Sequence, residues 1–90
     1  MSQHYEACPG VVWRALDDGL VLLDSARGLY FELNASARQM FEALCAGQPR
    51  SELLAGLSER FDVDPTTLAH DFDALCQQLL QQGLIRRIAP

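Results

Sequence analysis

Two short apolar runs early in the chain predict a β-hairpin. Residues 20–23 and 29–33 are rich in Leu, Val, Tyr and Phe, and they flank a polar stretch, residues 24–28, that ends in glycine. Runs of this composition on either side of a short loop are typical of paired antiparallel strands. Gly28 can adopt the left-handed backbone conformation that closes such a loop.

A third run, residues 11–16, predicts another strand. It precedes the turn residues Asp17-Asp18-Gly19, in which Gly19 suits a left-handed position. Short connections favour neighbouring antiparallel strands, so the three runs predict a meander. In this order the strand at residues 29–33 lies at an edge of the sheet.

The rest of the chain has the apolar periodicity of three amphipathic helices. The first is expected over about residues 35–46 with Asn34 as its N-cap, the second has Ser51 as a candidate cap, and the third begins at Asp64-Pro65. Their apolar positions are Ala37, Met40, Phe41, Leu44, Leu53, Leu54, Leu57, Phe61, Leu68, Phe72, Leu75 and Leu79. A small sheet followed by three helices predicts a two-layer α+β domain.

The two ends of the chain carry weaker signals. Residues 1–10 are expected to form a flexible N-terminal arm, because they end at the breakers Pro9-Gly10. Gly83 is expected to end the third helix, with a short extended segment after it. Residues 11–88 are expected to form a single domain.

Composition narrows the functional classes. The 90 residues include seven basic and twelve acidic side chains, giving a net charge of −5, which opposes a nucleic-acid partner. No apolar run approaches the ~18–20 residues of a membrane span. The N-terminus has no basic region followed by an apolar signal segment, so we expect a cytoplasmic protein without membrane contacts.

The cysteines and histidines give little support to catalysis. Cys8, Cys45 and Cys76 form no CxxC pair, which argues against a disulfide framework or a zinc site, and we expect Cys45 and Cys76 to be buried. His70 stands beside Asp71, but a metal site needs three or four ligands and no other ligand has suitable local spacing. A solvated helix face explains His70 better than a metal or an enzymatic role.

Two binding roles remain. A three-helix unit with a small sheet suggests a winged helix, yet residues 61–85 contain no arginine or lysine, so the third helix would repel DNA. Such a protein would act as a regulator through protein contacts. Alternatively, the edge strand at residues 29–33 accepts a peptide strand, unless the chain's own arm or tail covers it.

The order of motifs resembles the PqqD-like family, the stand-alone RiPP recognition elements. The resemblance covers roughly residues 11–85 and is carried by Val21-Leu22-Leu23-Asp24, the stretch GLYFELN at residues 28–34, Ala46-Gly47, Glu52-Leu53-Leu54, the stretch FDVDP at residues 61–65, residues 71–80 and Gly83-Leu84-Ile85. Each piece is degenerate, but the order and spacing together are fairly specific.

The resemblance implies a winged-helix-like bundle and a chaperone without catalysis or a cofactor. Such proteins bind the leader of a ribosomally made precursor peptide and present it to a modifying enzyme, such as a radical SAM protein or a leader peptidase. In the family the leader adds as a strand to the third strand and lies against the third helix. The matching positions here are Leu29, Tyr30, Phe31, Glu32 and Leu33 on the strand and Asp71, Leu75 and Gln78 on the helix.

Overall fold

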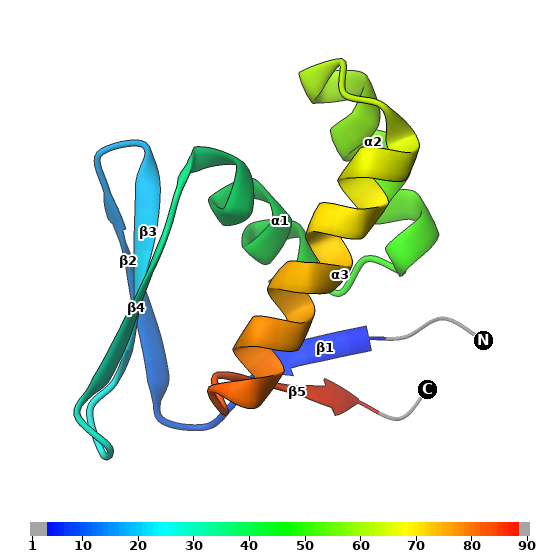
Figure 1. Cartoon of the computed structure of the whole chain (residues 1–90). Coiled ribbons are helices and arrows are strands. Elements are labelled where there is room, and N and C mark those ends of the chain that lie inside the picture. The colour runs from blue at the N-terminus through cyan, green and yellow to red at the C-terminus, as the bar shows by residue number, and fades with distance from the viewer. Residues whose placement is uncertain (1–3, 89–90) are drawn as a thin grey trace.

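The computed structural model describes residues 4–88 and has the predicted α+β architecture. The elements are β1 (His4–Ala7), β2 (Val11–Leu16), β3 (Gly19–Asp24), β4 (Leu29–Leu33), α1 (Ala35–Cys45), α2 (Arg50–Phe61), α3 (Pro65–Gln81) and β5 (Ile85–Ile88). Strands β2, β3 and β4 form the antiparallel meander, in that order, so β4 is an edge strand as predicted. The three helices lie on one side of this sheet, with α1 packed directly against it and α2 farthest from it (Figure 1).

Alternation along the strands directs one set of side chains into the core. On β3, Leu20 and Leu22 are buried while Val21 and Leu23 are not. Leu22 packs with Phe41 of α1 and Phe72 of α3 in a single apolar cluster that spans the sheet and all three helices. Burial of these large side chains holds the sheet against the helices, and Leu33 is the residue of β4 that is buried in this cluster.

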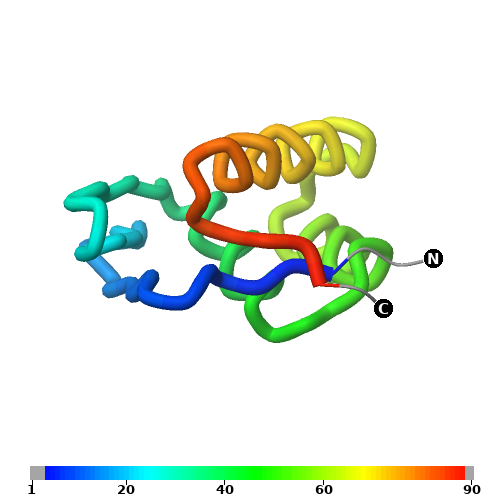
Figure 2. The backbone as a smooth tube through the Cα atoms, turned by 90° about the horizontal axis from the view of Figure 1, so that it is seen from below, coloured from blue at the N-terminus to red at the C-terminus, as the bar shows by residue number. Residues whose placement is uncertain are grey.

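The pairing of β1 with β5 is a feature that the sequence did not predict. His4 pairs with Ile88 and Ala7 with Ile85, so four residues of the expected N-terminal arm form a strand, and residues 1–3 of that arm lie outside the described residues. Figure 2 shows the two ends of the chain running side by side. The expected extended segment after Gly83 is present as β5. A short strand whose partner lies at the opposite end of the chain leaves no local signal.

The helix ends follow the expected chemistry with one exception. Asn34 accepts a hydrogen bond from the Ala37 amide, and Asp64 accepts one from the Thr67 amide. Gly83 has a φ of 71°, and the Leu84 amide donates to the Leu79 carbonyl at 2.9 Å, which is the Schellman arrangement. The proposed cap at Ser51 is wrong, because α2 begins one residue earlier, at Arg50.

The turn between β2 and β3 also differs from expectation. It is a two-residue loop, Asp17-Asp18, in which Asp17 rather than Gly19 has the positive φ, 54°. Gly19 is instead the first residue of β3. A Cβ atom there would lie 2.2 Å from the Leu33 carbonyl oxygen, so glycine is required by the close approach of β4.

The cysteines are placed differently from the prediction. Cys76 is buried, but Cys45, the last residue of α1, is exposed next to the buried Leu44. Burial raises the pKa of Cys76 to about 12, which keeps that thiol protonated at neutral pH. Across the described part of the chain, no helix is long and apolar enough to cross a membrane.

Candidate peptide-binding site

The edge strand β4 leaves part of its main chain unpaired within the sheet. It pairs with β3 on one side, from Leu20 with Leu33 to Asp24 with Leu29, and no other described strand pairs with it. An exposed edge of this kind is a template for a further strand.

The β2–β3 hairpin determines which amides of β4 face outward. Leu16 and Gly19 flank a two-residue loop, so the Leu16 carbonyl accepts from the Gly19 amide and the two form a hydrogen-bonded pair. Hydrogen-bonded and non-hydrogen-bonded pairs alternate along antiparallel strands. The main-chain groups of Leu22 therefore point toward β4.

The register of β4 on β3 completes this assignment. Leu22 pairs with Phe31, so the main chain of Phe31 points inward, and by alternation so do those of Leu29 and Leu33. The N–H and C=O groups of Tyr30 and Glu32 consequently point away from the sheet. A peptide adding at this edge would pair with these two residues.

The side chains of β4 divide between two faces. Leu29 and Phe31 are half-buried on the side of the helices, and Leu33 is buried. Tyr30, with 64% of its surface exposed, and Glu32 lie on the opposite face of the sheet. All five belong to the edge, but the side chains of Tyr30 and Glu32 are turned away from α3.

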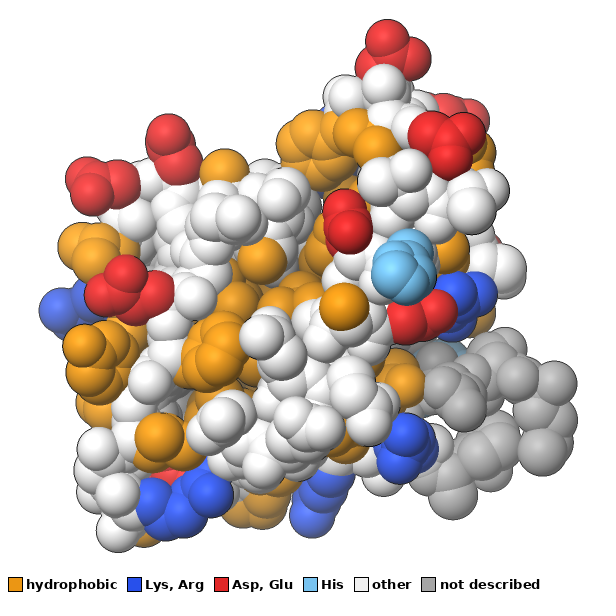
Figure 3. Space-filling model, in the orientation of Figure 1, with side chains coloured by type: hydrophobic (Ala, Val, Ile, Leu, Met, Phe, Trp, Pro, Cys, Tyr) orange, Lys and Arg blue, Asp and Glu red, His pale blue; other side chains and the backbone are white. Residues whose placement is uncertain are grey.

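A hollow lies between the sheet and the helices, with hydrophobic side chains gathered inside it (Figure 3). At its helical side is a pocket of about 120 Å³, lined by Ser36, Met40, Leu57, Phe61, Val63, Leu68 and Asp71. Ser36 lies in the first turn of α1, directly after β4, so the strand leads toward this pocket. Asp71 thus contributes a carboxylate to an otherwise mostly apolar lining.

The three predicted helix residues differ in exposure. Asp71 and Gln78 are exposed on α3, whereas Leu75 is 7% exposed and belongs to the core. Phe61, predicted only as part of the apolar face of α2, remains 38% exposed at the pocket. Its position at the end of an apolar helix stripe, directly before the helix-breaking stretch Asp62-Val63-Asp64-Pro65, is the sequence signal that could have identified it.

Arg27 is a structural residue of this region that the sequence did not reveal. Its Nε atom donates to Asp24 Oδ2 at 2.7 Å, and its guanidinium also donates to the Gln82 carbonyl at the C-terminal end of α3. The side chain therefore ties the β3–β4 loop to the helix end and fixes the spacing of β4 and α3. Its partner lies 55 residues away, so local pattern gives no indication of the contact.

The Asp24–Arg27 pair makes stability depend on pH. The hydrogen bond from Arg27 lowers the pKa of Asp24. A carboxyl whose pKa is lower in the folded state stabilises the fold above its ordinary pKa, and this contribution is lost as the pH falls through the lowered value. We expect the stability advantage of the wild type over Asp24→Asn, measured by urea denaturation, to shrink as the pH falls below about 4.

Arg27→Met is the matched control for this effect. It removes the cation and keeps an aliphatic side chain, so in its background the Asp24→Asn substitution should change stability by nearly the same amount at every pH. A pH-dependent difference that persists there, or one that grows as the pH falls, would contradict the assignment to this pair.

The acidic residues of α3 near the hollow differ in their partners. Asp73, two residues after Asp71, does not present an unpaired charge to the hollow. Instead both of its carboxylate oxygens accept from Arg50, at 3.0 and 2.7 Å. That arginine neutralises Asp73, which leaves Asp71 as the acidic group that lines the pocket.

Comparisons with known proteins agree with this geometry. The model of the family described as coenzyme PQQ synthesis protein D (PqqD) matches residues 19–85. Two solved structures resemble the whole fold. TbiB1 in complex with the TbiA(beta) leader peptide is 26% identical, with 94% of this chain and 99% of that chain covered and a TM-score of 0.84. A lasso peptide synthetase B1 complexed with the leader peptide is also 26% identical, with 92% of this chain and 98% of that chain covered and a TM-score of 0.85. No curated protein gives a significant match.

Proposed function

The chain belongs to the PqqD family, a family of non-catalytic binding domains, and we propose that it binds the leader of a ribosomally made precursor peptide by strand addition to β4. The observation that carries this proposal is the free edge of β4, where two residues direct their main-chain groups outward beside an apolar hollow. Both matched solved structures contain a leader peptide. Main-chain bonding at the edge supplies affinity, and side-chain pockets supply selectivity.

The hollow offers the second part of the proposed site. A leader strand beside β4 has alternate side chains on the helical side, facing the same direction as Leu29 and Phe31. Beyond Leu33, the peptide would reach the pocket that Phe61 and Asp71 line. We therefore assign an apolar leader side chain to this pocket, with a hydrogen-bond donor or a cation near the Asp71 carboxylate. Gln78 lies further along α3 as a polar contact.

The biological partner in this proposal is a maturation enzyme. The chain holds the leader while that enzyme, a radical SAM protein or a leader peptidase, acts on the rest of the precursor. We infer a cytoplasmic location from this role, because the precursor is made there by the ribosome. Within residues 4–88, no three or more His, Cys, Asp or Glu side chains gather in a way that could hold a metal ion.

Hydrogen–deuterium exchange with a leader peptide tests the proposal. The probe is a synthetic peptide matching the N-terminal part of a candidate precursor peptide. In the free chain the outward amides of Tyr30 and Glu32 should exchange fast, and bound leader should protect both because each donates to it. The amides of Phe31 and Leu33 should be slow with and without leader.

A scrambled peptide of the same composition is the control. Saturable binding with protection confined to another surface would refute strand addition while preserving the leader-binding role. An absence of binding to the matched leader would refute the role itself. A winged-helix regulator would instead bind a protein partner with no effect on these two amides.

A further inference from the structure

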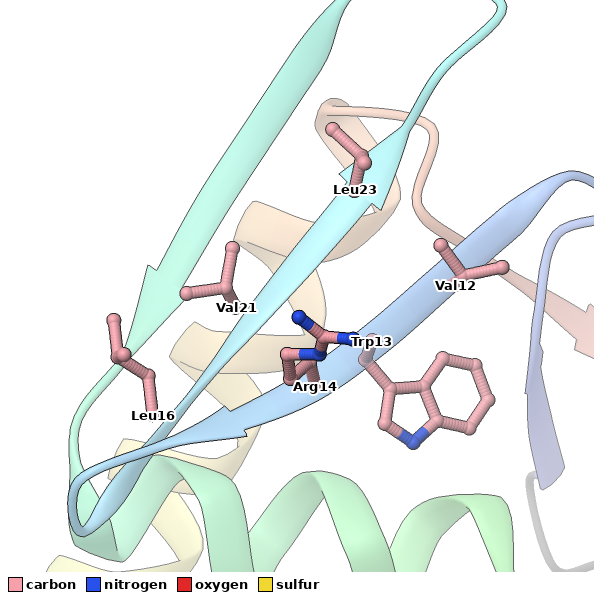
Figure 4. A pocket seen from close by; sticks show the side chains of 6 residues that line it. All are labelled: Val12, Trp13, Arg14, Leu16, Val21 and Leu23. Atoms are coloured by element: carbon pink, nitrogen blue, oxygen red, sulfur yellow. The ribbon is translucent and has the colours of Figure 1, made fainter.

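The sheet face turned away from the helices, which we term the outer face, is exposed and largely apolar. It consists of Val12, Arg14 and Leu16 on β2, Val21 and Leu23 on β3, and Tyr30 and Glu32 on β4. Figure 4 shows the β2 and β3 members among the residues that line a pocket on this face. Trp13 also lines this pocket, and its ring packs edge to face on Phe41, with 5.1 Å between ring centroids.

Several large apolar side chains of the outer face are exposed to solvent. Val12 and Leu16 are 58% and 54% exposed, and Leu23 is 40% exposed. Contiguous apolar side chains at a protein surface mark an interaction site more often than isolated ones do. The outer face does not face the hollow, so the proposed leader site does not account for it.

The register arranges the outer face in two rows across the strands. One row is Val12, Leu23 and Tyr30, and it is apolar throughout. The other is Arg14, Val21 and Glu32, with a cation on one edge strand and a carboxylate on the other. Adjacent strands are about 4.8 Å apart, so Arg14 and Glu32 are separated by about 10 Å. Among the described residues neither forms an ion pair with another side chain.

This arrangement is self-complementary. A two-fold axis that runs parallel to β3 and between two facing copies places β2 of one copy over β4 of the other. Arg14 then meets Glu32 of the second copy, twice per dimer, and Val21 meets its own counterpart. The same rotation places Val12 over Tyr30 and Leu23 over Leu23. An axis across the strands would instead place Arg14 over Val12 and leave both charges unpaired.

We propose that the outer face docks a second copy of this chain, forming a two-fold symmetric sandwich of two meanders held by reciprocal Arg14–Glu32 pairs. Aligned packing of twisted sheets, with strands within about 30° of each other, is a common way to bury two apolar sheet faces. The free edge of β4 remains at the side of the sandwich. The outer face has far fewer residues than the roughly 20–30 on each side of a standard interface, so the dimer is weak and dissociates on dilution.

Sedimentation velocity over a concentration series tests this proposal. The wild type should shift from monomer toward dimer between about 10 μM and about 1 mM, the range of a weak interface. Arg14→Glu alone should stay monomeric, because a carboxylate at that position would face Glu32, and Glu32→Arg alone should stay monomeric for the equivalent reason. Arg87→Glu is the control, since it makes the same charge change on β5, away from this face.

Two combinations make the test specific for the reciprocal pairing. An equimolar mixture of the two single variants should form a heterodimer. The Arg14→Glu chain presents two carboxylates and the Glu32→Arg chain presents two cations, so both reciprocal pairs join opposite charges. The double variant Arg14→Glu/Glu32→Arg should recover self-association. A wild type that remains monomeric throughout, or single variants whose mixture does not associate, would overturn the proposal. If the wild type is monomeric and Arg14→Glu instead weakens binding of a maturation enzyme, the outer face belongs to that enzyme.

Discussion

Tyr30→Pro is expected to lower leader affinity by about fivefold or more while leaving the domain folded. Tyr30 directs its amide outward from β4, and proline has no amide to donate. Losing one main-chain hydrogen bond costs about 1 kcal/mol, and up to about 3 kcal/mol when the leader carbonyl is left buried without a partner. Isothermal titration of the leader measures the affinity, and circular dichroism measures the fold.

Phe31→Pro is expected to have the opposite pattern. The Phe31 amide points to β3, where it pairs with Leu22, so proline there should break the ladder and destabilise the domain. Alanine variants at both positions separate side-chain loss from loss of the amide. If Tyr30→Pro binds leader as Tyr30→Ala does, the peptide does not pair with β4 and the proposed function loses its central observation.

Gly19→Ala is expected to be among the most destabilising single substitutions in the chain. The new Cβ would lie 2.2 Å from the Leu33 carbonyl oxygen, which is a backbone atom and cannot rotate away. Either the β2–β3 hairpin or β4 must shift, and we expect a loss on the order of 3 kcal/mol in the free energy of unfolding. Because Leu33 is part of β4, leader affinity should fall as well.

Gly56→Ala is the matched control. Gly56 lies within α2, and a Cβ atom there would have no neighbour within 4 Å. Alanine in an exposed helix interior is more favourable than glycine by about 0.5–1 kcal/mol, so this variant should be stabilised. Urea denaturation with a shared m-value compares the two variants. A Gly19→Ala variant as stable as the wild type would show that β4 does not approach Gly19 so closely.

The sequence predicted the elements whose signals are local. Alternation identified the meander and its edge strand, and Asn34, Asp64 and Gly83 marked helix ends through short-range hydrogen bonds. Each of these features involves residues within a few positions of one another. The three strands of the meander, the three helices and the family resemblance could therefore be predicted from the amino-acid sequence alone.

The features that sequence reasoning missed depend on distant residues. The contact of Arg27 with Gln82, the pairing of Arg50 with Asp73 and the close approach of Gly19 to Leu33 each join separate elements. Assigning the outward direction of the Tyr30 amide also required the pairing registers of the β2–β3 and β3–β4 hairpins. On α3, periodicity placed Leu75 in the apolar stripe, but the family resemblance grouped it with Asp71 as a binding residue. In the structure Leu75 is buried in the core, whereas Asp71 is exposed.

The pairing of β1 with β5 has a consequence for how this domain combines with others. His4 and Ile88 lie opposite each other in that ribbon, on the side of the molecule remote from β4 (Figure 1). A second domain fused to this one would therefore be attached at nearly the same place on its surface, whether the fusion is at the amino or the carboxyl end. Because β1 and β5 end side by side, the peptide-accepting edge of β4 would remain clear in either order of fusion.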